Sequence, residues 1–206
     1  PTTAGTGSET TRYSVVYCDG KKHSLTHDCI FPNIAIIDPT FLRTLPDYHR
    51  RSALLDALCQ AIESYWSKNS TEESRQLSAR SIHLFRYTYK HYIEGHPFVD
   101  DRIMKVAYLA GQAINITATT APHAMSYKIT SLKGIAHGHA VSLTLPYVYR
   151  YMLEYAVKAK DKSVHQTLMQ IARAFETDET KLFETLKSII KEFELEKPIV
   201  TESELK

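Results

Sequence analysis

Apolar residues recur with the period of an α-helix over most of the chain, from about residue 47 to residue 193. The pattern predicts helices over about 48–67, 72–94, 99–118, 121–129, 137–156, 163–175 and 178–193. Stretch 99–118 carries few charges after Lys105, so we expect it to be central. Pro46 and Asp47 are typical of a helix start, and Pro146 predicts a kink. Such a chain folds as a mainly α domain.

The first 46 residues have a different character. The opening "PTTAGTGSETT" is small, polar and flexible, whereas "YSVVY" and "NIAIID" are short β-rich runs with the turn-forming "CDGKK" between them. We therefore expect two parts, a β-containing segment over residues 1–46 and a helical domain over residues 47–206.

The chain's charge and apolar pattern exclude several classes. Its 25 basic and 23 acidic residues leave a net charge of +2 with no basic run, so nucleic acid is not an expected partner. No apolar run approaches the roughly 18 residues of a membrane span, and no signal-peptide pattern opens the chain. The odd set Cys18, Cys29 and Cys59, without C-x-x-C spacing, favours the reducing cytoplasm.

Both ends of the sequence are unusual. The chain opens without methionine, and "TESE" near its end resembles a capping box that starts a further helix. We therefore expect a fragment of a longer protein.

The stretch "LLDALCQAIE" places Asp56 in an otherwise apolar helix, with Gln60 one turn later on the same face. A buried carboxylate costs several kcal/mol unless its charge is compensated. Downstream, His123 and Tyr127 are four residues apart, and His137 sits beside glycines. One carboxylate, two imidazoles and an amide oxygen are plausible ligands for a divalent metal, which would compensate Asp56.

Each of these residues also has a plainer interpretation. An aspartate or histidine in a helix is more often a surface residue or a hydrogen-bonded core residue than a metal ligand. A glutamine such as Gln60 is more often a buried amide that forms hydrogen bonds, and a tyrosine such as Tyr127 more often packs in the core. His139, which alternates with His137, fits a position behind the ligands or on the surface. Similarly, "TTAGTGS" offers hydroxyls and backbone N–H groups for a phosphate, but it lacks a P-loop ending and is otherwise a mobile loop.

Together, "PTTAGTGSE", "NIAIIDPTFLRTLP", "LLDALCQAIESYWS", "HAMSYKI" and "HGHAVSLTLPYV" resemble motifs of the iron-containing (group III) alcohol dehydrogenases, which have a dehydroquinate synthase-like fold. The resemblance covers about residues 1–160. It implies the helical metal-binding domain of that fold, preceded by a short β-containing remnant of the N-terminal α/β nucleotide-binding domain. The Gly-Gly-Gly-Ser loop of that family is not in this sequence.

The resemblance also implies roles for individual residues. Asp56, His123 and His137 match three of the family's four metal ligands, and the fourth, a histidine in the family, is Gln60 here. A second family histidine, near substrate and nicotinamide, is replaced by Tyr127, whose hydroxyl keeps proton transfer to an alkoxide possible. A neutral amide is a weaker ligand than imidazole for Fe or Zn, so both departures bear on activity.

The implied function is a metal-dependent, NAD(P)H-linked alcohol dehydrogenase working as an aldehyde reductase. Its cofactors would be Fe²⁺ or Zn²⁺ and NAD(H) or NADP(H), and its partner a small-molecule aldehyde or alcohol. The residues implied to contact the nicotinamide cofactor are Thr2, Thr3, Thr6 and Ser8 at its phosphates and Lys22 near its ribose. A homodimer is compatible with this reading, and the fragment by itself is expected to be inactive.

The variant motifs are similar to those of the phosphonoacetaldehyde reductase subgroup. A phosphonate substrate requires cationic groups, for which Arg12, Lys128 and Lys133 are the candidates, although both lysines also fit a solvated surface. One alternative function is a redox-inactive, metal-poor binding or regulatory descendant, which Gln60 and Tyr127 support. A metal hydrolase with an Asp-His-His site is disfavoured, because the flanking motifs match dehydrogenases.

Overall fold

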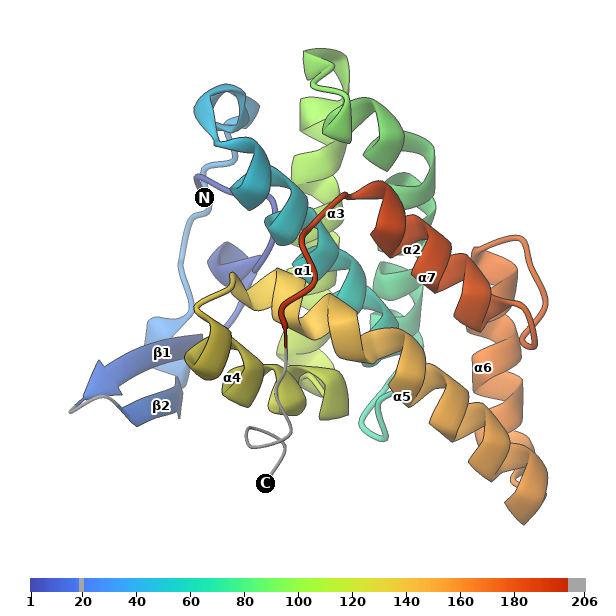
Figure 1. Ribbon diagram of the computed structural model, residues 1–206. Coiled ribbons are helices and arrows are strands. Elements are labelled where there is room, and N and C mark those ends of the chain that lie inside the picture. The colour runs from blue at the N-terminus through green and yellow to red at the C-terminus, as the bar shows by residue number, and fades with distance from the viewer. Residues whose placement is uncertain (19–20, 200–206) are drawn as a thin grey trace.

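A computed structural model describes residues 1–18 and 21–199 of the chain (Figure 1). Within these residues a β-hairpin and three short 3-10 helices precede a body of α-helices, and a fourth 3-10 helix joins α2 to α3. The hairpin strands are β1 (Tyr13–Cys18) and β2 (Lys21–Thr26). The helices are α1 (Asp47–Trp66), α2 (Glu72–Ile93), α3 (Asp100–Thr117), α4 (Ala121–Lys133), α5 (His137–Ala159), α6 (Lys162–Ala174) and α7 (Leu182–Glu192). The 3-10 helices are η1 (Ser8–Thr10), η2 (Asp28–Ile30), η3 (Pro39–Thr44) and η4 (Pro97–Val99).

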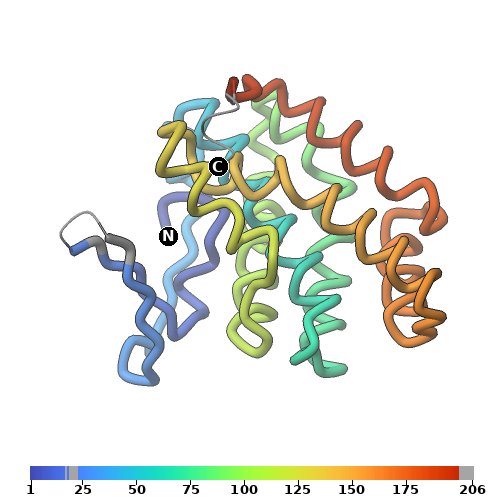
Figure 2. The backbone as a smooth tube through the Cα atoms, turned by 60° about the horizontal axis from the view of Figure 1, so that its bottom comes forward, coloured from blue at the N-terminus to red at the C-terminus, as the bar shows by residue number. Residues whose placement is uncertain are grey.

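The mainly α prediction is confirmed, and each predicted helix is present. The hairpin projects from one side of the helical body, while α6 and α7 lie on the opposite side (Figures 1 and 2). Helix α1 packs against α2, α3 and α5. Helix α3 is buried along most of its length, as its few charges predict. The proposed division at residue 46 stays a prediction, although α1 begins at Asp47.

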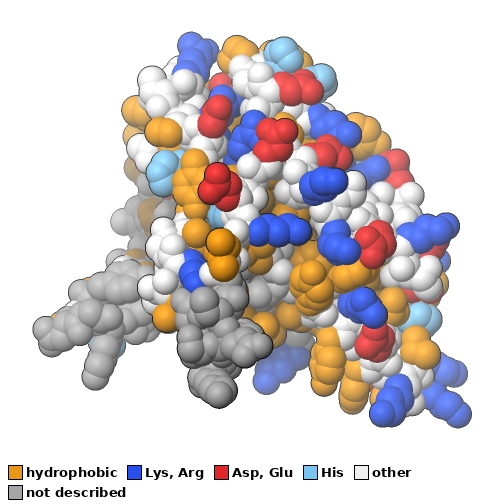
Figure 3. Space-filling model, in the orientation of Figure 1, with side chains coloured by type: hydrophobic (Ala, Val, Ile, Leu, Met, Phe, Trp, Pro, Cys, Tyr) orange, Lys and Arg blue, Asp and Glu red, His pale blue; other side chains and the backbone are white. Residues whose placement is uncertain are grey.

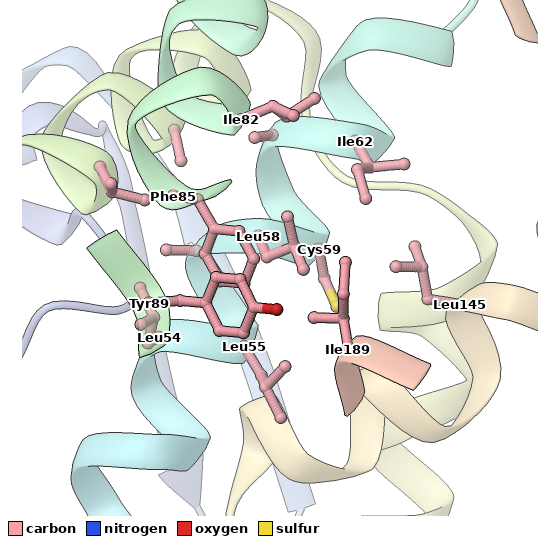
Figure 4. Packing of buried hydrophobic residues seen from close by; sticks show 14 of the residues in the cluster. Leu54, Leu55, Leu58, Cys59, Ile62, Ile82, Phe85, Tyr89, Leu145 and Ile189 are labelled. Atoms are coloured by element: carbon pink, nitrogen blue, oxygen red, sulfur yellow. The ribbon is translucent and has the colours of Figure 1, made fainter. Parts of the chain in front are cut away.

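The core forms where α1 and α2 bring their apolar faces together (Figure 4). Leu54, Leu58 and Ile62 recur along α1 and are fully buried or nearly so. The rings of Phe85 and Tyr89 on α2 stack with centroids 4.9 Å apart. Burying one such leucine contributes roughly 1.5–3 kcal/mol. This packing fixes α1, and with it the polar residues on its other face.

The prediction of a β-run over "NIAIID" is wrong. That segment forms no strand, and Ile34 and Ile36 are 82% and 79% exposed. Instead β1 pairs antiparallel with β2, from Tyr13 opposite Thr26 to Cys18 opposite Lys21, so part of the predicted turn "CDGKK" is strand. A β-strand requires a hydrogen-bonded neighbour, and none of the described residues provides one for residues 33–38.

Two helix boundaries differ from the sequence prediction by four residues. Helix α4 continues to Lys133 and ends at Gly134, which adopts a left-handed conformation. Helix α7 begins four residues late because the Asp178 side chain accepts hydrogen bonds from the backbone of Thr180 and Lys181, which holds a turn there. Helix α5 continues through Pro146. The predicted capping box "TESE" lies outside the described residues.

The visible surface mixes charges of both signs (Figure 3). Basic and acidic side chains alternate across the face shown, without a patch of one sign. Among the described helices, none is both long and apolar enough to cross a membrane.

Candidate metal and active site

Helix α1 buries Asp56 and Gln60 on the face that turns away from the core of α2. Their exposed fractions are 2% and 4%. Gln60 Nε2 donates a hydrogen bond to Asp56 Oδ2 over 3.1 Å. Because a carboxylate only accepts, the amide nitrogen must face it, which leaves Gln60 Oε1 for another partner.

The predicted histidines converge on Asp56 from two other helices. His123, in the first turns of α4, places Nε2 3.3 Å from Asp56 Oδ1, and His137, the first residue of α5, places Nε2 3.9 Å from the same oxygen. The three ligand atoms lie within 4.8 Å of one another. Two ligand atoms each 2.0–2.1 Å from a tetrahedral ion would be roughly 3.3 Å apart, so the spacing is close to that of a metal site.

The buried polar atoms of this cluster fit a cation. Asp56 Oδ1, Gln60 Oε1 and His123 Nε2 are buried without a hydrogen-bond partner among the described residues. Buried polar atoms are normally paired, so three orphans facing one centre call for an explanation. One carboxylate oxygen, one amide oxygen and two imidazole nitrogens suit Zn²⁺ or Fe²⁺.

A second layer of polar groups orients His123. Glu63 Oε1 lies 2.5 Å from His123 Nδ1, and Glu63 Oε2 accepts hydrogen bonds from the backbone N and the Oγ1 of Thr120. Trp66 Nε1 donates to the same Thr120 hydroxyl. With Nδ1 donating to Glu63, the ring presents Nε2 to Asp56.

Ser126 performs the same task for His137. Its hydroxyl donates to the carbonyl of His123 over 2.7 Å, and its oxygen lies 3.3 Å from His137 Nδ1. Because the Ser126 hydroxyl donates its proton to the His123 carbonyl, its oxygen can accept a hydrogen bond from His137 Nδ1. This bond leaves His137 Nε2 facing Asp56.

Sequence reasoning missed Glu63 and Ser126. One feature of the sequence could have indicated Glu63 as a site residue. It lies in the apolar stretch "LLDALCQAIE", seven residues and two turns after Asp56, on the same helix face.

The charge balance at His123 follows from its surroundings. Burial lowers the pKa of His123, but the charges of the Glu63 and Asp56 carboxylates and the hydrogen bond to Glu63 raise it to about 10. Without a metal, a proton on His123 therefore separates two buried carboxylates. A divalent cation would replace the Nε2 proton, since a ligating imidazole must give that proton up.

Close contact between α1 and α5 sets the position of His137. A Cβ on Gly138 would lie 2.1 Å from Ser52 O and 2.7 Å from Asp56 Cβ, so only glycine fits between the helices. The backbone N of His139 donates to Ser52 Oγ. His139 itself is buried, with Nδ1 3.3 Å from the Tyr48 hydroxyl and burial lowering its pKa. The surface position predicted as one alternative for His139 is therefore wrong, and a place behind the ligands stays a prediction.

A cavity of about 670 Å³ opens onto the cluster. Tyr127 lines it, is 40% exposed, and stacks on His137 with ring centroids 5.9 Å apart. Thr6 and Ser8 of the opening loop line the same cavity. That loop packs tightly on α3, because a Cβ on Gly7 would meet the backbone of Gly111 at 2.6 Å.

The other predicted contact residues lie elsewhere or are not described. Thr2 is exposed and Thr3 half-buried, and neither lines the cavity. The side chain of Lys22 lies outside the described part, although its backbone belongs to β2.

The three predicted cations do not line the cavity either. Arg12 pairs with Asp28 over 2.9 Å, Lys128 is exposed, and Lys133 is half-buried. Within the described residues the cavity wall contains no lysine or arginine and several serine and threonine hydroxyls.

Two family models match the chain. The model for the "Fe-containing alcohol dehydrogenase family, C-terminal" matches residues 52–202, and that for "Iron-containing alcohol dehydrogenase" matches residues 1–39. The first describes the C-terminal part of these enzymes, which agrees with the mainly helical fold.

Curated relatives point to the same enzymes. The chain is 35% identical over 165 residues to a phosphonoacetaldehyde reductase of Streptomyces viridochromogenes, covering 78% of this chain and 41% of the relative. It is 32% identical over 160 residues to long-chain-alcohol dehydrogenase 1 of Geobacillus thermodenitrificans, covering 77% and 40%. The chain thus spans less than half the length of these relatives.

Solved structures share the fold. A sulfoacetaldehyde reductase of Bifidobacterium kashiwanohense, in complex with NAD⁺, superposes with a TM-score of 0.88 at 30% identity, covering 100% of this chain and 55% of that one. An iron-containing alcohol dehydrogenase of Thermococcus thioreducens gives a TM-score of 0.90 at 26% identity, with coverage of 98% and 53%. The chain therefore belongs to the iron-containing alcohol dehydrogenase family.

Proposed function

We propose that this protein is a metal-dependent, NAD(P)H-linked alcohol dehydrogenase that works as an aldehyde reductase. The observation that carries the proposal is the convergence of Asp56 Oδ1, His123 Nε2 and His137 Nε2 at one cavity. The names of relatives, which include alcohol dehydrogenases and aldehyde reductases, support the reaction class.

Asp56, His123 and His137 would hold the metal, with Gln60 Oε1 as a fourth ligand. When bound, the metal supplies a Lewis acid for the carbonyl oxygen and the nicotinamide cofactor supplies the hydride. Glu63 and Ser126 keep the two imidazoles in the required orientation. The apolar packing of α1 keeps Asp56 out of bulk water, which strengthens its attraction for a cation.

Tyr127 is the proposed proton donor to the product alkoxide. Its ring lies on His137 at the cavity wall, so a substrate oxygen near the cluster would also be near this side chain. Thr6 and Ser8 are the proposed contacts to the cofactor phosphates, because both face the same cavity. Thr2, Thr3 and Lys22 stay predictions from the family resemblance.

The proposed substrate is a short aldehyde that carries an anionic group, with phosphonoacetaldehyde as the leading candidate. Two relatives are named for such aldehydes, phosphonoacetaldehyde and sulfoacetaldehyde. The cavity's hydroxyl groups can donate hydrogen bonds to such an anion. We also propose a cytoplasmic location, which the free thiols of Cys29 and Cys59 support. A homodimer stays a prediction.

The test uses the longest natural protein that contains this chain. We expect it to retain about one Fe²⁺ or Zn²⁺ per chain and to oxidise NADH or NADPH with phosphonoacetaldehyde faster than with uncharged acetaldehyde. Tyr127→Phe should lower kcat and leave the metal content unchanged. Metal content without turnover on any aldehyde would favour the redox-inactive descendant, and cofactor-independent hydrolysis would favour a hydrolase.

A further inference from the structure

A second group of metal-ligating side chains lies at the C-terminal end of α2, outside the cavity described above. His91, Glu94 and His96 place their ligand atoms within 4.8 Å of one another. His91 Nδ1 is 3.8 Å from Glu94 Oε2, and His96 Nε2 is 3.4 Å from the same oxygen. These separations resemble those of the Asp56 cluster and approach the roughly 3.3 Å between ligands of a tetrahedral ion.

The backbone holds these three residues in place. Gly95 has a φ of +85°, the backbone N of His96 donates to His91 O over 2.9 Å, and Gly95 N donates to Tyr92 O over 3.1 Å. This pair of bonds is the Schellman motif that ends many helices. It brings His91 and His96, five residues apart in sequence, onto one side of the helix end, with Glu94 between them. The two imidazoles are therefore neighbours without any metal.

Several groups at this end of α2 bear on a cation. The last carbonyls of α2 give the helix end a partial negative charge, and Arg50 Nη2 donates to one of them, the carbonyl of Tyr92, over 2.9 Å. Phe98 packs beside both imidazoles, with ring centroids 5.2 Å from His91 and 5.6 Å from His96, and so restricts their motion. Each ligand side chain is about half exposed, which leaves a path for an ion and water. Histidine and acidic side chains lie together at the upper end of the molecule, where α2 turns towards α3 (Figures 1 and 3).

We propose that His91, Glu94 and His96 form a second divalent-metal site. Two imidazole nitrogens and one carboxylate oxygen select Zn²⁺, Ni²⁺ or Cu²⁺ over Mg²⁺ or Ca²⁺, and water completes the coordination. The bound ion would link the last turn of α2 to the segment that leads into η4 and α3. It would thereby stabilise the α2–α3 connection.

The two sites are independent. Helix α3 begins at Asp100, four residues after His96, and ends at Thr117 near the cavity. Its 18 residues span roughly 27 Å at 1.5 Å per residue. The two sites lie near opposite ends of this helix, so they are too far apart to share a ligand. The second site does not depend on the proposed enzymatic activity.

The experiment is a calorimetric titration of the chelator-treated, 206-residue chain with Zn²⁺ in a non-coordinating buffer. We expect two binding events in the unsubstituted chain. His96→Ala should weaken one of them at least tenfold, and Glu94→Gln should weaken the same event. Asp56→Asn should weaken the other event, so that failure of the cavity site and failure of this site are distinguishable.

His83→Ala is the matched control, because His83 is an exposed histidine on the same helix without two further ligands beside it among the described residues. It should leave both events intact. In NMR spectra, Zn²⁺ should shift the ring resonances of His91 and His96 in the Asp56→Asn variant. An unchanged isotherm for His96→Ala, or equal losses for His83→Ala and His96→Ala, would overturn the proposal.

Discussion

Glu63 lies directly behind His123, with its Oε1 2.5 Å from the ring Nδ1 while the ring Nε2 faces Asp56. The same carboxylate accepts two hydrogen bonds from Thr120 through its other oxygen. Because Glu63 is fully buried, water does not stabilise its carboxylate, and His123 and Thr120 do so instead. The orientation of a proposed ligand is thus set by a residue that does not itself face the cavity.

Glu63→Gln should weaken metal binding by about 10- to 100-fold. In a glutamine, one of the two positions held by Oε1 and Oε2 becomes an NH₂ group, which only donates. It would oppose either the required Nδ1–H of His123 or the two donors of Thr120. Competition with a chelator measures the change. Glu73→Gln, an exposed position in the first turn of α2, is the control and should bind metal like the unsubstituted chain. Equal affinity in both variants would remove Glu63 from the site.

Gln60→His should raise the metal affinity, because imidazole donates more strongly than an amide oxygen to Zn²⁺ or Fe²⁺. Gln166→His adds an imidazole at an exposed position of α6 and should leave the affinity of the cavity site unchanged. If Gln60→His binds no more tightly than the unsubstituted chain, residue 60 is not a ligand position.

Asp56→Asn should lower the affinity of the cavity site at least tenfold, since it removes the only anionic ligand of the cluster. Zn²⁺ or Fe²⁺ competition with a chelator checks this. An Asp47→Asn variant, which alters an exposed acid in the first turn of α1, is the control. An affinity that stays constant in Asp56→Asn would show that the aspartate is structural.

Much of this arrangement follows from the sequence, because helix periodicity and buried charges are local signals. Spacing made Asp56, Gln60, His123 and His137 candidate ligands, and the family resemblance implied their roles. The structure brings Asp56, His123 and His137 together. Glu63 escaped notice because its role depends on a contact with α4, sixty residues away. The wrongly predicted strand over residues 33–38 has the same cause: strand formation depends on a partner, which a single segment does not specify.

Gly138→Ala should destabilise the chain by at least about 1–3 kcal/mol, because the added Cβ would lie 2.1 Å from Ser52 O and force α5 away from α1. The shift would also move His137 and weaken metal binding. Urea unfolding and chelator competition measure the two effects. Gly134→Ala, where no atom lies within 4 Å of the added Cβ, carries only the backbone strain of its positive φ and should keep the metal affinity. A metal affinity reduced equally in both variants would contradict the close-contact explanation.

The metal-free chain should lose stability as the pH rises from about 6.5 towards 10. His123 has a folded-state pKa of about 10, above its ordinary value of 6.5, because the Glu63 and Asp56 carboxylates outweigh the effect of burial. A raised folded-state pKa means that the contribution is fully present below pH 6.5 and is lost as the pH rises through 10. Between these limits one proton is bound only in the folded state, which gives a slope of about 1.4 kcal/mol per pH unit.

Urea unfolding in the presence of a chelator at pH 6.5, 7.5 and 8.5 measures this slope. The comparison is Glu63→Gln, which removes one of the two carboxylates that raise the pKa of His123 and should therefore flatten the profile. Excess Zn²⁺ should also flatten the profile of the unsubstituted chain, because the ion takes the place of the Nε2 proton. Other groups that titrate in this range contribute equally to both proteins and cancel in the difference. Parallel profiles for the unsubstituted chain and Glu63→Gln would mean that His123 does not hold its proton between the two carboxylates.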